Sequence, residues 1–159
     1  MTTTAVRALR TAPHRGGDVL NERLRVTPRH GDHPPLREDA CRVGVMRRIT
    51  AARLRYCDLE ALLDETMLIV TELLTNALLH SGTTQISLSI TVEGDTLHIA
   101  VGDGMPGCAA PKPTDEDAES GRGLTIVENL VQENGGTWGT RDSGATTWCR
   151  LKITTADAP

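Results

Sequence analysis

The chain has 159 residues, enough for one domain with a sizeable core, and it carries a net charge of −4. It contains no Phe, one Tyr and two Trp, and this shortage of aromatic side chains argues against a base-stacking platform for single-stranded nucleic acid. The negative charge argues equally against a protein that binds the phosphate backbone. We therefore expect no direct nucleic-acid partner and a core built from Leu, Ile, Val, Met and Ala.

The four cysteines, Cys41, Cys57, Cys108 and Cys149, have neither CxxC spacing nor a His at the distance that a zinc site needs. The expectation is four reduced thiols, mostly buried as small hydrophobic side chains. No apolar stretch is long enough to span a bilayer, and the N-terminus lacks the apolar core of a signal peptide. These features predict a cytoplasmic protein without a membrane partner.

Residues 1–36 are predicted to form a basic, largely irregular N-terminal segment. They are rich in Arg, Thr, Pro, His and Gly and show no sustained periodicity. The alternation in Glu22–Val26 is the exception, and it indicates a possible edge strand. Residues 37–155 show periodic patterns and form the predicted domain.

Two helices are expected next. The first begins at Arg37, and its pattern gives an apolar face made by Cys41, Val45, Ile49 and Ala52. Asp58 is in the right position to cap the second helix. That helix is expected to end at Ser81-Gly82, where glycine supplies a C-cap.

After the second helix, the apolar residues recur every two positions, as in a β-strand. Apolar residues alternate with polar ones in two segments, Ile86-Leu88-Ile90 and Leu97-Ile99-Val101, and the turn at 93–95 joins them into a β-hairpin. Residues 102–120 are expected to be loop, followed by a helix from about Gly123 to Glu133 and two short strands near 137–141 and 146–153. This order predicts an α+β fold, a two-layer sandwich with helices on one face of a mixed, mostly antiparallel sheet.

Glu72 and Asn76 lie four residues apart on the second helix and therefore share one face. Most of their neighbours are apolar, so both polar side chains are costly unless they are satisfied. One interpretation is that they point to solvent on an amphipathic helix. The other is a metal–phosphate site, in which the Asn76 oxygen suits Mg²⁺ and Glu72 accepts a proton from a nucleophile.

Three further motifs are weak when each is taken alone. Asp103 opens the segment 103–107, and its carboxylate could accept a hydrogen bond from an amine such as that of adenine, although Asp-Gly is also an ordinary turn. Gly121-Arg122-Gly123 precedes the predicted helix, where free amides and an Arg favour phosphate, but GxG is also simple loop flexibility. Residues 144–147 lead into the last strand and either face a ligand or only turn.

The order of these motifs resembles the GHKL-type ATPase domain, or Bergerat fold. Its N box, G1 box, ATP lid and G2 box correspond to Glu72–His80, Asp103–Gly107, 108–120 and Gly121–Val127. The segments VTELLTNALLHS and DAESGRGLTIVENL are most similar to stand-alone anti-sigma factor serine/threonine-protein kinases, the actinobacterial histidine-kinase-like ATP-binding proteins.

The resemblance implies binding of ATP and Mg²⁺, with Asn76 as the metal ligand and Glu72 as the catalytic base. It also implies that Asp103 binds the adenine amine. The other implied nucleotide contacts are Gly107, Gly121, Arg122, Gly123, Leu124 and Thr146. Family members phosphorylate a serine on a STAS-domain antagonist and bind a sigma factor, so these are the implied partners, together with a second copy in a homodimer.

Two positions depart from the family pattern: Met105 stands where the G1 box usually has glycine, and Glu119 stands where kinases can carry Arg. The chain is therefore expected to be a serine/threonine kinase or, alternatively, a non-catalytic module whose partner surface is controlled by nucleotide through residues 108–120. A detached histidine-kinase catalytic domain ranks last, because the sequence shows no long helix pair with a phospho-acceptor His.

Overall fold

The computed structural model describes residues 17–27, 36–80, 83–104 and 118–153. The order of elements in this part of the chain confirms the order predicted from periodicity, and the possible edge strand near 22–26 corresponds to β1. The elements are β1 (Gly17–Arg25), α2 (Arg37–Tyr56), α3 (Leu63–His80), β2 (Gln85–Glu93), β3 (Thr96–Gly102), α4 (Ala118–Asn134), β4 (Thr137–Arg141) and β5 (Thr146–Lys152).

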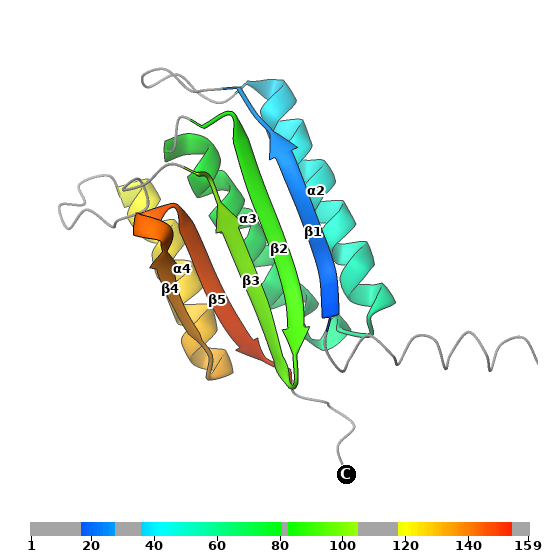
Figure 1. Cartoon of the computed structure of the whole chain (residues 1–159). Coiled ribbons are helices and arrows are strands. Elements are labelled where there is room, and N and C mark those ends of the chain that lie inside the picture. Colours follow the sequence, from blue (N-terminus) through cyan, green and yellow to red (C-terminus); the bar gives the residue numbers. More distant parts are fainter. Residues whose placement is uncertain (1–16, 28–35, 81–82, 105–117, 154–159) are drawn as a thin grey trace, which may run out of the picture.

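The described strands form one five-stranded sheet in the order β1-β2-β3-β5-β4, and every neighbouring pair is antiparallel. The expected α+β sandwich is therefore confirmed, with a sheet that is antiparallel rather than mixed in the described residues. α2, α3 and α4 all lie on one face of the sheet (Figure 1). β1 occupies an edge, and it begins at Gly17, earlier than the alternating residues from Glu22.

The core lies between the sheet and the helices. Alternate residues of β2 and β3 point into it, and the six predicted apolar positions, Ile86, Leu88, Ile90, Leu97, Ile99 and Val101, are all at most 4% exposed. Because side chains alternate across a strand, the residues between them project to the other face of the sheet. None of the three described helices covers that face.

The apolar face expected for α2 is wrong. Of its four residues, Cys41, Val45 and Ala52 are exposed and Ile49 is half-buried. The face that packs on the core instead carries Asp39, Val43, Met46, Thr50 and Leu54. A hydropathy pattern misses this face because two of its residues are polar and have internal hydrogen-bond partners.

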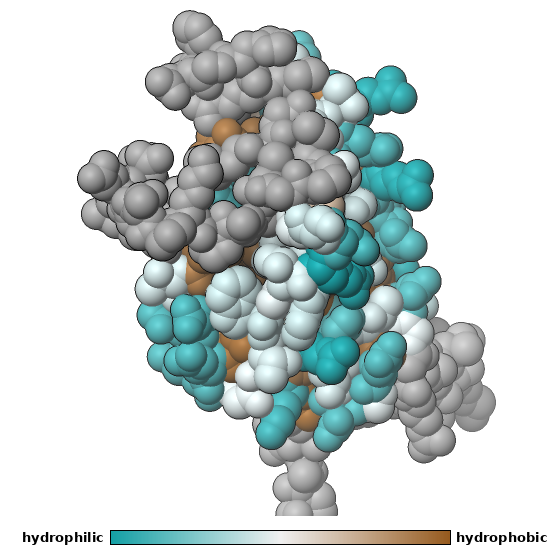
Figure 2. Space-filling model, turned by 60° about the vertical axis from the view of Figure 1, so that its left-hand side comes forward, coloured by the Kyte–Doolittle hydropathy of each residue, from teal (hydrophilic) through white to brown (hydrophobic). Residues whose placement is uncertain are grey.

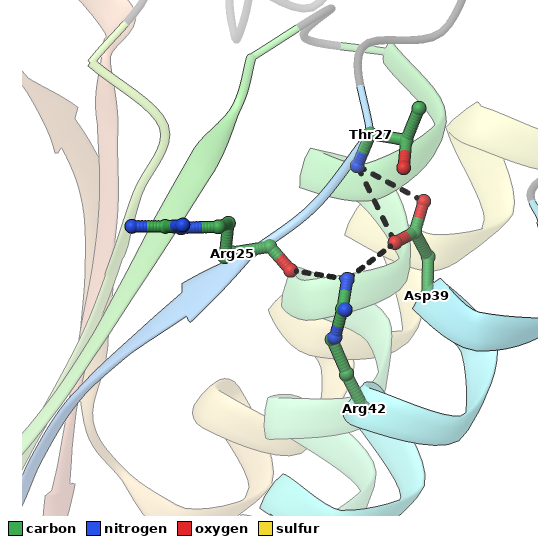
Figure 3. A network of polar contacts seen from close by, with 4 residues as sticks. All are labelled: Arg25, Thr27, Asp39 and Arg42. Carbon is green, nitrogen blue, oxygen red and sulfur yellow. Dashed lines mark hydrogen bonds and ion pairs between the residues drawn. The ribbon is translucent and has the colours of Figure 1, made fainter.

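Those partners join α2 to β1. The Asp39 carboxylate accepts hydrogen bonds from the Thr27 N–H, at 3.1 and 3.3 Å, and from Arg42 Nη1 at 3.2 Å. Arg42 Nη1 also donates to the carbonyl of Arg25 at 3.0 Å, so one guanidinium links strand and helix (Figure 3). Since an edge strand leaves backbone groups without a sheet partner, these contacts anchor β1 to α2.

The start of α3 differs from the prediction. Asp58 does not cap the helix; it has a φ of 58°, and a 3-10 turn at Glu60–Leu62 leads into a helix that begins at Leu63. Asp and Asn tolerate this left-handed region better than most residues, which explains an Asp in the turn after α2. α3 ends at His80, and the predicted cap at 81–82 lies outside the described residues.

The start of α4 also differs, because the helix begins at Ala118 and not near Gly123. Gly121-Arg122-Gly123 is therefore part of the helix and not a turn before it. A glycine costs a helix only about 1 kcal/mol relative to Ala, which is too little to delay its start. The helix ends as predicted near Gly135, whose φ is 81°, with the Gly136 N–H donating to the Val131 carbonyl at 2.8 Å.

Candidate nucleotide site

Four separate segments meet at one end of the molecule. The C-terminal half of α3, the end of β3, the start of α4 and the start of β5 all lie at the upper end in Figure 1. α3 packs against both β3 and α4, and α4 packs against β5. The fold therefore brings together the elements that carry Glu72, Asn76, Asp103 and the Gly121–Gly123 segment.

Asp103 is the most firmly placed of these residues. It follows β3 directly and is 9% exposed. Its N–H donates to the Ala145 carbonyl at 2.9 Å, and its own carbonyl accepts a hydrogen bond from the Thr83 hydroxyl at 2.7 Å. The alternation of β3 directs its side chain to the helix side of the sheet, as it does for Val101.

The register of β5 separates Thr146 from Asp103. Thr146 pairs with Gly102, so its side chain projects to the face away from the helices, where its hydroxyl donates to Asp142 Oδ2 at 3.2 Å. Thr147 pairs with Val101 and is 7% exposed, which puts it on the same face as Asp103. A contact of Thr146 with adenine stays a prediction, while Thr147 has the side-chain direction that such a contact needs.

Glu72 and Asn76 are both half-buried on α3. The residues around them include the fully buried Ile69, Val70, Leu73 and Leu74. The two polar side chains thus lie at the border of the core and not in open solvent. This placement fits groups that face a ligand at this end of α3, because such groups need a polar partner at a partly dry site.

The remaining predicted contacts are placed less fully. Leu124 is half-buried and packs against the core. Only the backbone of Gly121, Arg122 and Gly123 is described, and Gly107 and Met105 lie outside the described residues. The unpaired amides of a helix belong to its first turn, so in α4, which begins at Ala118, they lie before Gly121.

Sequence reasoning missed two residues of this site, Thr83 and Thr147. Thr83 is 8% exposed, and its hydroxyl also lies 2.9 Å from the Gln85 carbonyl. Its signal was slight, a hydroxyl residue just before a strand. The signal for Thr147 was stronger, since Thr147, Cys149 and Leu151 alternate as one buried face.

The donor set fits a nucleotide. Asp103 is 9% exposed, and Thr147 lies on the same face of the sheet. A carboxylate at such a position can accept a hydrogen bond from an amine such as that of adenine. Within the described ranges, no group of three or more His, Cys, Asp or Glu is placed to hold a metal ion. A Mg²⁺ ion that takes one amide oxygen and completes its shell with phosphate and water does not need one.

Comparison with known proteins agrees with this geometry. No helix in the described residues is long and apolar enough to cross a bilayer. A search of curated proteins finds no match to the chain. Residues 36–151 match the family model described as the histidine kinase-like ATPase domain. The match covers most of the chain and includes every predicted site residue, so the chain belongs to the histidine kinase-like ATPase domain family, and this membership implies ATP binding.

Proposed function

We propose that the chain is an ATP–Mg²⁺-dependent serine/threonine protein kinase of the anti-sigma factor type. The observation that carries the proposal is the meeting of the α3 pair, Glu72 and Asn76, with the end of β3 and the start of α4 at one end of the fold. The proposed substrate is a serine of a STAS-domain antagonist, and the proposed regulatory target is a sigma factor. The resemblance of the motifs 70–81 and 117–130 to that group supports both.

Each residue has a defined task in this proposal. Asp103 holds the adenine amine, and Thr147 is a second candidate contact beside it. Asn76 holds Mg²⁺, which would neutralise phosphate charge. We propose that the backbone of Gly107, of Gly121–Gly123 and of Thr146, with Arg122 and Leu124, lines the rest of the nucleotide.

Glu72 is the proposed base. In the reaction, the serine oxygen forms a bond to the γ-phosphorus, the bond from that phosphorus to the β–γ bridging oxygen breaks, and ADP leaves while Glu72 takes the hydroxyl proton. Catalysis of such a transfer comes mainly from positioning the reacting groups and from neutralising the phosphate charge. The half-buried position of Glu72 on α3 supports its role, because it lies on the same helix face as Asn76.

The test measures transfer directly. The protein is incubated with γ-labelled ATP, Mg²⁺ and candidate STAS-domain proteins, and label on a partner serine is the expected result. Glu72→Gln removes the base while keeping the shape, so it should abolish most transfer but retain ATP binding. Asp64→Asn is the matched control, because Asp64 is an exposed acid in the first turn of the same helix.

The outcomes separate two functions. Transfer that is lost in Glu72→Gln and kept in Asp64→Asn supports the kinase. ATP binding without transfer to any candidate supports the alternative, a non-catalytic nucleotide-dependent regulatory module, which the departures at Met105 and Glu119 favour. Transfer that is equal in the Glu72→Gln variant contradicts the role of Glu72.

A cytoplasmic homodimer is part of the proposal. The outer surface of α2 supports it, because Val45 and Tyr56 are 43% and 56% exposed there. Light scattering is expected to give twice the chain mass, and Val45→Asp is expected to shift the protein toward the monomer. A monomeric wild-type protein at micromolar concentration would contradict the dimer.

A further inference from the structure

The open face of the sheet, on the side away from the three helices, has an unusual charge. The strand registers place five basic side chains there, Arg23, Arg25, Arg141, Arg150 and Lys152. Three acidic side chains lie on the same face: Asp18, Glu93 and Asp142, the last of which bonds Thr146 and lies 3.9 Å from Arg141. All eight are exposed. The whole chain carries a net charge of −4, so this basic sheet face is positive against the charge of the rest of the protein.

One cation on the basic sheet face is held in place by its neighbours. Arg150 Nε donates to His98 Nε2 at 2.8 Å, and the guanidinium carbon lies 5.3 Å from the centre of the Trp148 ring. His98 and Trp148 stack with their ring centres 6.0 Å apart and 27° between planes. Trp148 in turn lies over Gly139, where an added Cβ would be 2.9 Å from Trp148 Cζ2.

These contacts hold the Arg150 side chain in place, but none of them is an ion pair with a carboxylate. Among the described residues no acidic side chain forms an ion pair with it. Its terminal nitrogens are therefore available, and a planar guanidinium that is already ordered loses little conformational entropy when it binds a carboxylate. Arg and Trp are also the residue types that contribute most to protein interfaces.

We propose that the basic sheet face is a docking surface for an acidic segment of a partner protein, with a partner carboxylate bound by Arg150 beside Trp148. Charge complementarity selects this occupant. A second copy of the chain, related by a two-fold axis, would set the arginines of one face against those of the other. Nucleic acid and anionic lipid present extended anionic surfaces that meet the net charge of −4 of the whole chain, whereas a short acidic segment meets only the basic sheet face.

The shape of the face agrees with a protein partner. The middle of the face carries small side chains, Ser87, Ser89 and Thr91 on β2 and Ala100 on β3. Figure 2 shows a pale band of intermediate hydropathy bordered by hydrophilic groups on this side of the molecule. A segment lying on the band has arginines on both sides, Arg23 from β1 and Arg150 from β5.

The experiment uses the full chain and a defined probe, a fluorescein-labelled peptide of alternating Glu and Leu, followed by fluorescence anisotropy. We expect binding to the wild type, and a loss of affinity of about fivefold in Arg150→Gln, as for one surface ion pair. Arg23→Gln is a second variant, at a side chain that makes no hydrogen bond or ion pair with the described residues, and it should weaken binding similarly. Arg47→Gln makes the same charge change on α2 and should have no effect.

Three results would overturn the proposal: no binding of the acidic peptide, equal binding of a peptide with Lys in place of Glu, or equal loss in Arg47→Gln. Labelled single-stranded DNA and vesicles containing phosphatidylserine are run in parallel. Stronger Arg150-dependent binding of either one would replace the proposed occupant. ATP affinity, measured by calorimetry on the same variants, should not change, so the outcome is independent of the proposed kinase function.

Discussion

The hydroxyl of Thr83 donates a hydrogen bond to the main-chain carbonyl of Asp103 at 2.7 Å. Both residues are buried, so the bond fixes the backbone at the point where β3 delivers the proposed adenine-binding carboxylate. The rest of the site depends on elements that are far apart in the sequence, and this bond ties the start of β2 to the end of β3.

Replacing Thr83 with Val keeps the shape and removes the bond. We expect the free energy of unfolding to fall by about 1–3 kcal/mol, the cost of leaving a buried polar group unpaired, and ATP affinity to weaken because Asp103 is less firmly placed. Urea denaturation and calorimetry measure the two effects. Thr83→Ser retains the hydroxyl and should behave like the wild type; equal losses in Ser and Val variants would contradict the role of this bond.

The hydrogen bonds of Asp39 that join β1 to α2 lead to a second prediction, on the stability of the fold. Asp39→Ala removes the acceptor for the Thr27 N–H and for Arg42, and it should lower the free energy of unfolding by about 1–3 kcal/mol. Arg42 is 44% exposed, so its unpaired charge is partly solvated and the loss should not exceed this range. Glu38→Ala, an exposed acid in the same helical turn, is the control and should cost less than about 1 kcal/mol.

Part of the fold could be predicted from the sequence alone. Strict alternation identified β2, β3 and their buried residues, because both strands have one apolar and one polar face. Periodicity did not identify the buried face of α2, because that face includes the polar residues Asp39 and Thr50. Hydrogen bonds to Thr27 and Met46 satisfy these two side chains, and a hydropathy pattern does not show such bonds. Periodicity failed at the start of α4 because Gly121 and Gly123 were interpreted as a turn although the helix tolerates them.

The site was predictable to a similar degree. Spacing alone placed Glu72 and Asn76 on one helix face, and the order of the motifs brought Asp103 to the same site. The choice of Thr146 over Thr147 could not be made from the motif, because it depends on which face of the sheet each residue occupies. The register with β3 decides that, and it follows from tertiary pairing.

His98 gives a pH-dependent prediction. Burial is the main cause that lowers its pKa below 6.5, with further lowering by Arg150 and Arg141 against an opposing effect of Glu93. The unfolded chain therefore binds the proton at higher pH than the folded chain. Stability from this residue is complete above pH 6.5 and is lost as the pH falls toward the lowered folded pKa.

His98→Gln keeps an acceptor for Arg150 and does not titrate. Relative to this variant, the wild type should lose free energy of unfolding between about pH 7 and pH 5, as urea denaturation at each pH would show. If the wild type instead gained stability relative to His98→Gln as the pH falls, protonation of His98 would be favoured in the folded state. That result would contradict the lowering of its pKa by burial and by Arg150.

The described cysteines should differ sharply in reactivity. Cys41 is exposed, while burial raises the pKa of Cys57 and raises that of Cys149 to about 12. Alkylation of the native protein with iodoacetamide, mapped by peptide mass spectrometry, should label Cys41 rapidly and Cys149 only after denaturation. Labelling of native Cys149 at the rate of Cys41 would contradict its buried position.

In the proposed function, Asp103 at the end of β3 holds the nucleotide. Isothermal titration of ATP–Mg²⁺ into the wild type and Asp103→Asn tests it most directly, because Asn keeps the size but replaces one carboxylate oxygen with a donor that opposes the adenine amine. We expect measurable binding to the wild type and a loss of at least about tenfold in Asp103→Asn, with circular dichroism showing that the variant is folded. Equal affinity in a folded Asp103→Asn variant, or no ATP binding by the wild type, would contradict it.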